Sequence, residues 1–238
     1  MTQISFSEVL FSIQLEIKQI MRTSKIDHVA YITPDMEKTI RFYRDLLGMR
    51  LVTGIGHEGY RHYFFETGKS LIAFFEYEGA QPMEYNKFHG QKTGRPMGFD
   101  HISFTVESRE DLFAMKDRLE AAGIKVDGAV DHGLFWSIYF FDPVSNLPLE
   151  MTWNFVELTN MPTMHEVKPL SVAEEGADPQ PGHWPEVTNP TPEAKMTAHP
   201  GNGILMRSTI IGQGAGYLTE QAKAAGITVE TNENQVPL

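Results

Sequence analysis

The chain has 238 residues, of which 41% are hydrophobic, 11% aromatic and 21% charged, a composition typical of a globular protein with enough apolar side chains for a core. Its 20 Lys and Arg residues against 31 Asp and Glu give a formal net charge of −11, and such an acidic surface repels nucleic-acid phosphates and anionic lipids. The absence of cysteine excludes disulfides, thiolate metal sites and cysteine nucleophiles. Any metal must therefore be held by His, Asp or Glu, and we expect neither a nucleic-acid nor a membrane partner.

Residues 1–24 have the spacing of an amphipathic helix. Charged residues separate apolar ones that recur about every four positions, which predicts an apolar stripe on one face. The apolar positions are Val9, Ile13, Ile17 and Ile20. The run is broken by polar residues and is followed by no small-residue cleavage site, unlike a secretory signal. We therefore expect a helix that docks on protein, in a cytoplasmic protein.

An internal repeat follows this helix. The run IDHVAYIT at 26–33 matches FDHISFTV at 99–106 around an Asp-His pair. Further along, YFFETGKSLIAFFEY at 63–77 echoes YFFDPVSNLPLEMTW at 139–153. The chain is therefore predicted to contain the same structural unit twice.

Each copy has the pattern of a strand, a helix and three more strands. Thr33 is expected to cap the first helix and Gly48 to end it, while Ser108 caps the second and Gly123 ends it, as their residue types favour. The later strands are predicted at 51–56, 61–67 and 70–77 in the first copy and at 124–130, 137–143 and 147–153 in the second.

These elements predict one α+β domain at 25–154, built from modules at 25–80 and 98–154. The extension at 155–238 holds nine of the 14 prolines and is expected to be partly irregular. Within it, the segment STIIGQGAGYLTEQAKAAG at 208–226 predicts a strand, a glycine turn and a short helix.

The repeat also predicts a metal site. Matching the two Tyr-Phe-Phe runs pairs His28 with His101 and places Glu150 opposite Phe74. A lone histidine in a strand is usually a hydrogen-bonded core residue, but the recurrence of Asp-His and the lone buried carboxylate favour metal binding. Two imidazoles and a carboxylate leave positions open on a divalent ion. We expect these three ligands to converge on one cation, with Glu76 as a candidate fourth ligand.

The repeat resembles the vicinal oxygen chelate superfamily, which includes glyoxalase I, bleomycin- and fosfomycin-resistance proteins and type I extradiol dioxygenases. The resemblance covers residues 25–154 and rests on the opening run IDHVAYITPDMEKTIRFYRDLLGM and on FDHISFTV through DPVSNLPLEMTW. It implies paired βαβββ modules whose sheets curl around a metal, with His28, His101 and Glu150 at the family's ligand positions. It also implies a small-molecule substrate and pairing into a homodimer or higher homo-oligomer.

One stretch points to a branch of this family. Residues 132–143 are similar to the extradiol dioxygenase signature, in which a His, an aliphatic residue, a Tyr and Asp-Pro precede the ligand Glu. Ser145 replaces the Gly of that pattern, and one extra residue precedes Glu150. Glyoxalase-like members place a fourth ligand where this chain has Phe74. The resemblance therefore favours an Fe(II)-dependent dioxygenase that cleaves a catechol-like or other vicinal-oxygen substrate with O₂.

The same resemblance suggests which residues carry out the reaction. His132 and Tyr139 would hydrogen-bond substrate or an oxygen intermediate, and His89, which precedes His101 by 12 residues, would accept a substrate proton. Three aromatic residues are expected to shape an apolar pocket: Phe74, Phe135 and Trp136. The alternative is that the strand aromatics are core residues and that the two loop histidines belong to the surface.

Two other classes of function stay open. One is a redox-neutral lyase, isomerase or thiol transferase that uses Mn, Zn or Ni as a Lewis acid. The other is a protein that binds and sequesters a small molecule without a metal. Oxygen consumption separates the first from a dioxygenase, and metal content separates the second.

Overall fold

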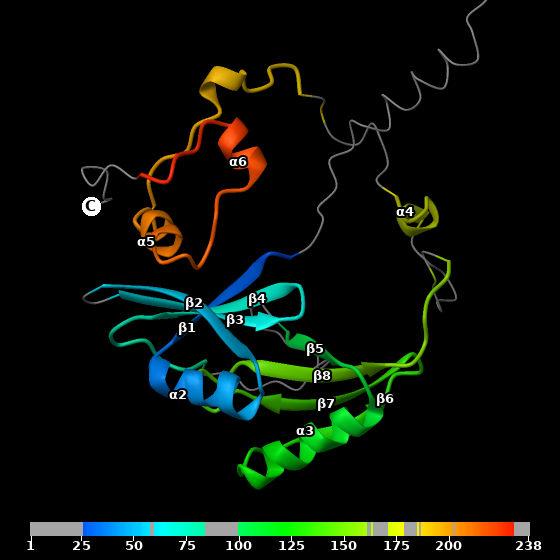
Figure 1. Ribbon diagram of the computed structural model, residues 1–238. Coiled ribbons are helices and arrows are strands. Elements are labelled where there is room, and N and C mark those ends of the chain that lie inside the picture. Colours follow the sequence, from blue (N-terminus) through cyan, green and yellow to red (C-terminus); the bar gives the residue numbers. More distant parts are fainter. Residues whose placement is uncertain are drawn as a thin grey trace, which may run out of the picture.

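Two four-stranded sheets with their helices form the body of the protein (Figure 1). The computed structural model describes residues 26–57, 60–83, 100–160, 163, 171–178, 185, 187–201 and 203–230. The predicted N-terminal helix at 1–24 and the candidate base His89 lie outside these residues.

The first sheet is the first βαβββ module. Its elements are β1 (His28–Thr33), α2 (Met36–Ile40), the π-helical turn η1 (Arg41–Leu46), β2 (Arg50–His57), β3 (Tyr60–Thr67) and β4 (Ser70–Glu76). The strand order is β1-β4-β3-β2, in which β1 runs parallel to β4 and the other pairs are antiparallel.

The second sheet repeats this arrangement. Its elements are β5 (Ile102–Val106), α3 (Arg109–Ala121), β6 (Asp127–Asp131), β7 (Phe135–Phe141) and β8 (Pro148–Asn154). The strand order β5-β8-β7-β6, again with one parallel and two antiparallel pairs, matches that of the first sheet. The structure therefore confirms the predicted α+β fold of paired βαβββ modules.

The helix ends follow the predicted chemistry with one shift. Ser108 caps α3 by accepting the backbone N–H of Asp111, and Gly48 and Gly123 adopt positive φ after the helices, as glycine readily does. The first helix begins later than predicted, because Asp35, not Thr33, caps α2. Thr33 is instead buried and its hydroxyl bonds that of Thr39 at 2.7 Å.

The register of the sheets corrects the match made from sequence. In the second sheet, Glu150 lies between Ser103 and Tyr139. The same position in the first sheet, opposite the second residue after the Asp-His pair, is held by Ala73. Ala73, and not Phe74, is therefore the structural counterpart of Glu150.

The cause is a difference in the connection between the last two strands of each module. Glu66 pairs with Leu71, five positions later, whereas Phe141 pairs with Pro148, seven positions later. The connection is thus two residues longer in the second module. A sequence match made without a gap is therefore wrong by one position between β3 and β7, and by one position in the opposite direction between β4 and β8. Because side chains alternate across a strand, Phe74 faces the opposite side from the Glu150 position, and it is fully buried there.

Both modules share one hydrophobic core. In the first module, the rings of Phe65 and Phe74 pack on Tyr43 of η1, with centroids 5.7 and 4.6 Å apart. In the second, α3 buries Leu112 and Leu119 against its sheet. All five belong to one buried cluster. The core therefore lies on the helix side of each sheet and leaves the other face outside it.

Hydrogen bonds join the two modules near their helices. The buried Tyr43 hydroxyl donates to Oδ2 of Asp142 in the turn between β7 and β8, at 2.9 Å. Arg118 of α3 donates to the backbone oxygen of Asp45 at 3.2 Å. These contacts fix the relative position of the modules on the core side.

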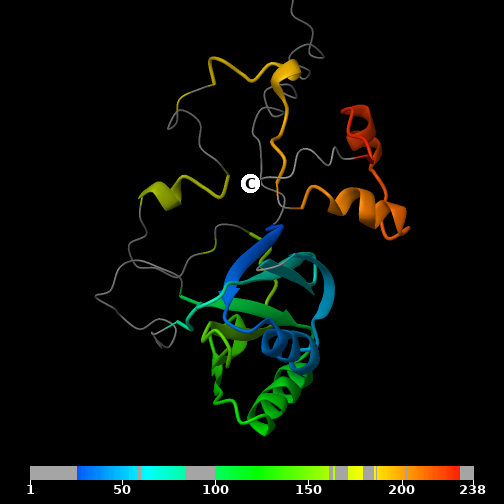
Figure 2. The ribbon, with the colours of Figure 1, turned by 90° about the vertical axis from the view of Figure 1, so that its left-hand side faces the viewer.

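The C-terminal extension contains short helices, which both views place on the side of the sheets away from α3 (Figures 1 and 2). They are α4 (Ser171–Glu174), η2 (Glu193–Lys195), α5 (Met206–Gly212) and α6 (Glu220–Ala224). The strand predicted at the start of 208–226 is wrong, because residues 208–211 lie in α5, whereas the short helix after the glycine turn is confirmed as α6. Every helix in the described part of the chain is too short or too polar to cross a membrane.

Candidate metal site

The two Asp-His pairs have the same local geometry. Nδ1 of His101 lies 2.7 Å from Oδ1 of Asp100, and Nδ1 of His28 lies 2.9 Å from Oδ1 of Asp27. A carboxylate on one ring nitrogen fixes the tautomer and leaves Nε2 as the nitrogen that can bind a metal. Both histidines are thus oriented as metal-binding imidazoles commonly are.

Glu150 supplies a carboxylate beside the second of these histidines. Its side chain lies on β8, is 4% exposed, and places Oε2 at 3.0 Å from Nε2 of His101. Both are atom types that bind divalent metals. His101 and Glu150 therefore form two parts of the predicted ligand set.

A chain of hydrogen bonds extends from this carboxylate. The Tyr139 hydroxyl donates to Oε1 of Glu150 at 2.7 Å and lies 2.8 Å from Nε2 of His132. Because the hydroxyl has one proton, which Glu150 accepts, His132 donates to the tyrosine oxygen through Nε2–H. The structure thus brings together four of the predicted site residues: His101, Glu150, Tyr139 and His132.

The surroundings shift the pKa of two of these groups. Burial alone raises the pKa of Glu150, but hydrogen bonds from Ser137, Tyr139 and Ser103 and the charge of His101 outweigh it and lower the pKa overall. Burial, followed by the Glu150 carboxylate, raises the pKa of Tyr139. The carboxylate is therefore held as an anion, and the tyrosine as a protonated donor.

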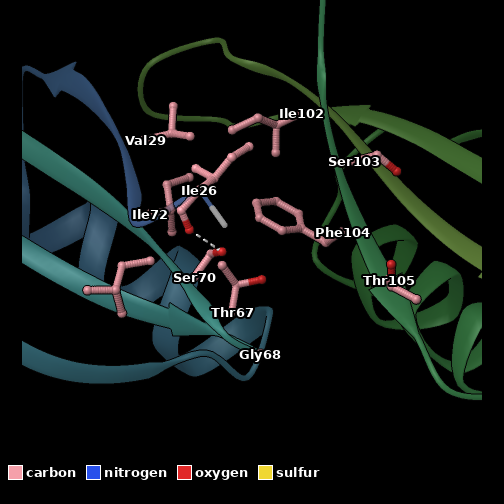
Figure 3. A pocket seen from close by; sticks show the side chains of 11 residues that line it. Ile26, Val29, Thr67, Gly68, Ser70, Ile72, Ile102, Ser103, Phe104 and Thr105 are labelled. Carbon is pink, nitrogen blue, oxygen red and sulfur yellow. Dashed lines mark hydrogen bonds between the residues drawn. The ribbon is translucent and has the colours of Figure 1, made fainter. Parts of the chain in front are cut away.

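His28 lies apart from this cluster. A cleft of about 390 Å³ separates the edge strands β1 and β5, and Val29 and Ile72 face Ile102 and Phe104 across it (Figure 3). Neighbouring residues point to opposite faces of a strand, so His28 lies on the face of β1 opposite to that of Val29. Its ring contacts Phe64 edge-on, with centroids 5.7 Å apart.

The three predicted ligands consequently do not meet within one chain. No group of three or more His, Asp or Glu side chains is placed to hold a metal ion in the described ranges. The expectation that they converge on one cation in a single chain is therefore not met. The physical reason is that both ligand-bearing faces are turned away from the core that joins the modules.

Glu76 has other partners. Its Oε1 accepts the backbone N–H of Met36, at the start of α2, at 2.7 Å, and its Oε2 pairs with Arg61. It also lies on the core face of β4, two residues after Phe74. Glu76 is thus a helix-capping residue in the first module.

The predicted aromatic pocket is divided between the two faces of the sheets. Phe135 lies on the Tyr139 face and its ring packs at 5.0 Å from that of His132. Trp136 faces the other way and packs on Trp153 at 5.6 Å. Phe74 is in the core. Phe135 alone of the three is positioned beside the candidate site.

Sequence reasoning missed several hydroxyls around Glu150. Ser103 and Ser137 each bond the hydroxyl of Thr152, at 2.7 and 3.0 Å. The signal was available, because polar residues at every second position of otherwise apolar strands share a face. Together they make the surroundings of Glu150 polar.

Sequence reasoning also did not single out His62 of the first module. It is 6% exposed, yet its Nε2 has no hydrogen-bond partner among the described residues, which costs about 1–3 kcal/mol for a buried polar atom. Burial, followed by the charge of His28, lowers its pKa. Its side chain lies on the same face as that of His28.

The donor set fits a divalent cation of borderline character. Imidazole nitrogens with carboxylate partners and a desolvated glutamate are ligands for Fe, Mn, Zn or Ni. Nε2 of His101 and Oε2 of Glu150 lie 3.0 Å apart, and His28 presents the same kind of donor on the other module. The residues present therefore fit the metal that the fold implies.

The chain belongs to the Glyoxalase/Bleomycin resistance protein/Dioxygenase superfamily, whose family model matches residues 25–151, just over half of the sequence. Membership supports a metal-dependent enzyme of the vicinal oxygen chelate type and confirms the family resemblance drawn from the repeat.

Individual relatives cover the same region. A Bacillus subtilis (strain 168) protein named "Putative ring-cleaving dioxygenase MhqE" is 29% identical over 136 residues, which are 54% of this chain and 41% of that protein. The chain thus spans about two-fifths of the length of this curated relative.

Solved structures match that region as well. A glyoxylase/bleomycin resistance protein/dioxygenase domain from Frankia sp. EAN1pec is 24% identical with a TM-score of 0.46, over 56% of this chain and 100% of that one. The fosfomycin resistance protein FosX from Listeria monocytogenes is 22% identical with a TM-score of 0.42, over 57% of this chain and 97% of that one.

Proposed function

We propose that the protein is an Fe(II)-dependent dioxygenase that cleaves the ring of a catechol-like substrate. The observation that carries this proposal is the continuous run of polar contacts from Asp100 through His101, Glu150 and Tyr139 to His132. A tyrosine and a histidine beside a ligand carboxylate are suited to a substrate that brings two oxygens to a metal. The name of the Bacillus relative, a ring-cleaving dioxygenase, agrees with this reaction class.

The proposed ligand set is His28, His101 and Glu150, completed by a second copy of the chain. One chain turns its two ligand-bearing faces away from the shared core, so the first module of one copy would face the second module of another. Each copy then contributes to two equivalent sites, as a twofold dimer requires. The predicted homodimer thereby acquires a chemical role.

An Fe(II) ion held in this way would leave positions open for the two vicinal oxygens of a catecholate and for O₂. The Tyr139 hydroxyl, which holds its proton and donates to Glu150, lies where a substrate oxygen next to that carboxylate can share its hydrogen bond. His132 stabilises the tyrosine oxygen through Nε2–H. Phe135 shields His132 from water on one side, and His89 is proposed as the acceptor of a substrate proton.

The test combines metal analysis with oxygen uptake. Protein purified without added metal is analysed for Fe, Mn, Zn and Ni, then loaded with Fe(II) and supplied with a panel of catechols in an oxygen electrode. We expect stoichiometric oxygen consumption with at least one catechol, and its loss in His101→Ala. His199→Ala, in the exposed extension, is the matched control and should retain activity.

Two outcomes would replace the proposal. Turnover in anaerobic buffer with Mn, Zn or Ni would assign a redox-neutral lyase, isomerase or transferase. Ligand binding that survives His101→Ala, in protein that binds no metal, would assign a sequestering protein.

A further inference from the structure

His62 is the buried group that the proposed chemistry leaves unused. Its Nε2 lies out of solvent without a hydrogen-bond partner among the described residues. Native proteins leave few such atoms unpaired, and an unpaired one at a candidate site calls for a partner outside the chain.

The ring of His62 is held in a fixed orientation. It stacks on Phe75 with centroids 3.5 Å apart and an interplanar angle of 13°, and it lies 4.2 Å from the ring of Phe64. Aromatic contacts on two sides restrict rotation of the imidazole. A ring locked in this way is preorganised to hydrogen-bond in one direction.

The register places His62 on the proposed ligand face. Along this face, β3 presents His62 and Phe64, β4 presents Ala73, and β1 presents His28 and Ala30. The Phe64 ring lies between the two histidines, with its centroid 5.7 Å from that of His28 and 4.2 Å from that of His62.

The second module shows what this position does in its own half of the site. Ser137 pairs with Thr152 and lies two residues before Tyr139, as His62 pairs with Phe75 and lies two residues before Phe64. Ser137 hydrogen-bonds the Glu150 carboxylate. His62 therefore occupies the matching place in the first module, where Ala73 stands in the position of Glu150.

We propose that Nε2 of His62 hydrogen-bonds an oxygen substituent on the ring of the substrate, separate from the two oxygens that bind the metal. This inference rests on the proposed function and refines its substrate class to catechols with a third oxygen group, hydroxyl or carboxylate. In the proposed site, the two vicinal oxygens have the metal, Tyr139 and His132 as partners. A hydrogen bond to Nε2 of His62 therefore requires a further polar group on the substrate. A site built to hydrogen-bond such a group discriminates strongly against substrates that lack it.

The extension borders this part of the face. Ile55 pairs with His62 across β2 and β3, and a Cβ at Gly203 would lie 3.2 Å from its Cδ1. The segment before α5 thus contacts the strand next to His62, and Gly203 leaves room for that contact.

The test uses His62→Phe in the full-length chain. Phenylalanine keeps an aromatic ring on Phe75 and removes the unpaired nitrogen. Binding is measured anaerobically by calorimetry on Mn(II)-loaded protein, with catechol, pyrogallol, hydroxyquinol and 2,3- and 3,4-dihydroxybenzoate as probes. We expect wild type to bind at least one three-oxygen probe tenfold or more tightly than catechol, and His62→Phe to lose that preference.

Stability and metal binding distinguish this role from a structural one. Removing an unpaired buried nitrogen should leave the unfolding midpoint equal or higher, with Mn(II) affinity within about twofold of wild type. Trp136→Phe is the matched control, because Trp136 Nε1 is also buried without a partner among the described residues but lies on the opposite face of its sheet. That variant should leave every probe affinity unchanged.

Four results would overturn the inference. The first is that His62→Phe keeps the preference for a third oxygen, and the second is that wild type binds catechol without such a preference. Both results overturn the role of His62 and leave the proposed function standing. A lower unfolding midpoint with equal losses for all probes would assign His62 a structural role. Wild type that binds no catechol at all would overturn the proposed function as well.

Discussion

Tyr139 connects the candidate ligand Glu150 to His132 through a single hydroxyl. Tyr139→Phe removes the donor to a buried carboxylate while keeping the ring. Groups that hydrogen-bond metal ligands typically contribute 10–100-fold to metal affinity, so we expect the Kd for Mn(II) to rise by about tenfold. Calorimetry measures it, with the 86%-exposed Tyr217 changed to Phe as control. Unchanged affinity would show that the hydroxyl does not support the carboxylate.

Asp142 should make stability depend on pH. Burial raises its pKa above the ordinary 3.8, and the bonds from Val144, Ser145 and Tyr43 only partly oppose this. A raised folded-state pKa gives stability that is fully present below 3.8 and is lost as pH rises through the folded pKa. Asp142→Asn lacks this loss, because its amide stays neutral.

The measurement is urea unfolding of both proteins between about pH 4 and pH 7. We expect the stability of Asp142→Asn relative to wild type to increase as the pH rises. Asp117→Asn, exposed on α3, should show no such trend. A constant difference for Asp142→Asn would mean that the carboxyl titrates alike in the folded and unfolded states.

At the scale of elements, Glu76 links β4 to the start of α2. Glu76→Ala leaves the Met36 N–H without its acceptor and Arg61 without its partner. We expect the free energy of unfolding to fall by about 1–2 kcal/mol, the range of a lost helix cap, with Mn(II) affinity unchanged. Chemical denaturation and calorimetry test the two parts, against the neighbouring Glu78→Ala. Loss of metal affinity would restore Glu76 as a ligand.

The elements themselves were largely predictable from sequence, and their register was not. The Asp-His repeat, the helix ends at Gly48 and Gly123 and the succession of strands and helix in two equal modules follow from local patterns. The match of Phe74 to Glu150 failed because the turn before β8 is longer, and an odd shift exchanges the two faces of a strand. The wrong match therefore assigned Phe74, a core residue, to the expected substrate pocket.

The strand predicted from Ser208 onward failed for a different reason. Thr209, Ile210 and Ile211 are β-branched and favour strands locally, but Met206 and Ile210 are four apart and share a helical face. This segment has no strand partner among the described residues, so its local preference for a strand is not decisive. A helix satisfies its own backbone, and α5 forms.

At the scale of the whole molecule, the sequence could place the ligands on strands but not decide which faces meet. The same Asp-His pairs are compatible with a site within one chain or between two copies. The structure joins the modules near their helices, and no group of three or more possible ligands assembles among the described residues. The proposed site between two copies would bring the three ligands together.

Subunit mixing tests this arrangement directly. His28→Ala and His101→Ala each destroy both sites of a homodimer. In a mixed dimer, one site loses both histidines and the other keeps all three ligands. Because random mixing makes about half of the dimers mixed, we expect about a quarter of the wild-type metal sites and catechol turnover to return.

The control is a mixture of His101→Ala with Glu150→Ala. Both substitutions lie in the second module, so every site in that mixture carries one of the two substitutions. No activity should therefore return. Subunit exchange is verified in each mixture with two affinity tags. If exchange occurs and His28→Ala with His101→Ala still recovers nothing, the second copy does not complete the site, and the ligands must assemble within a rearranged single chain.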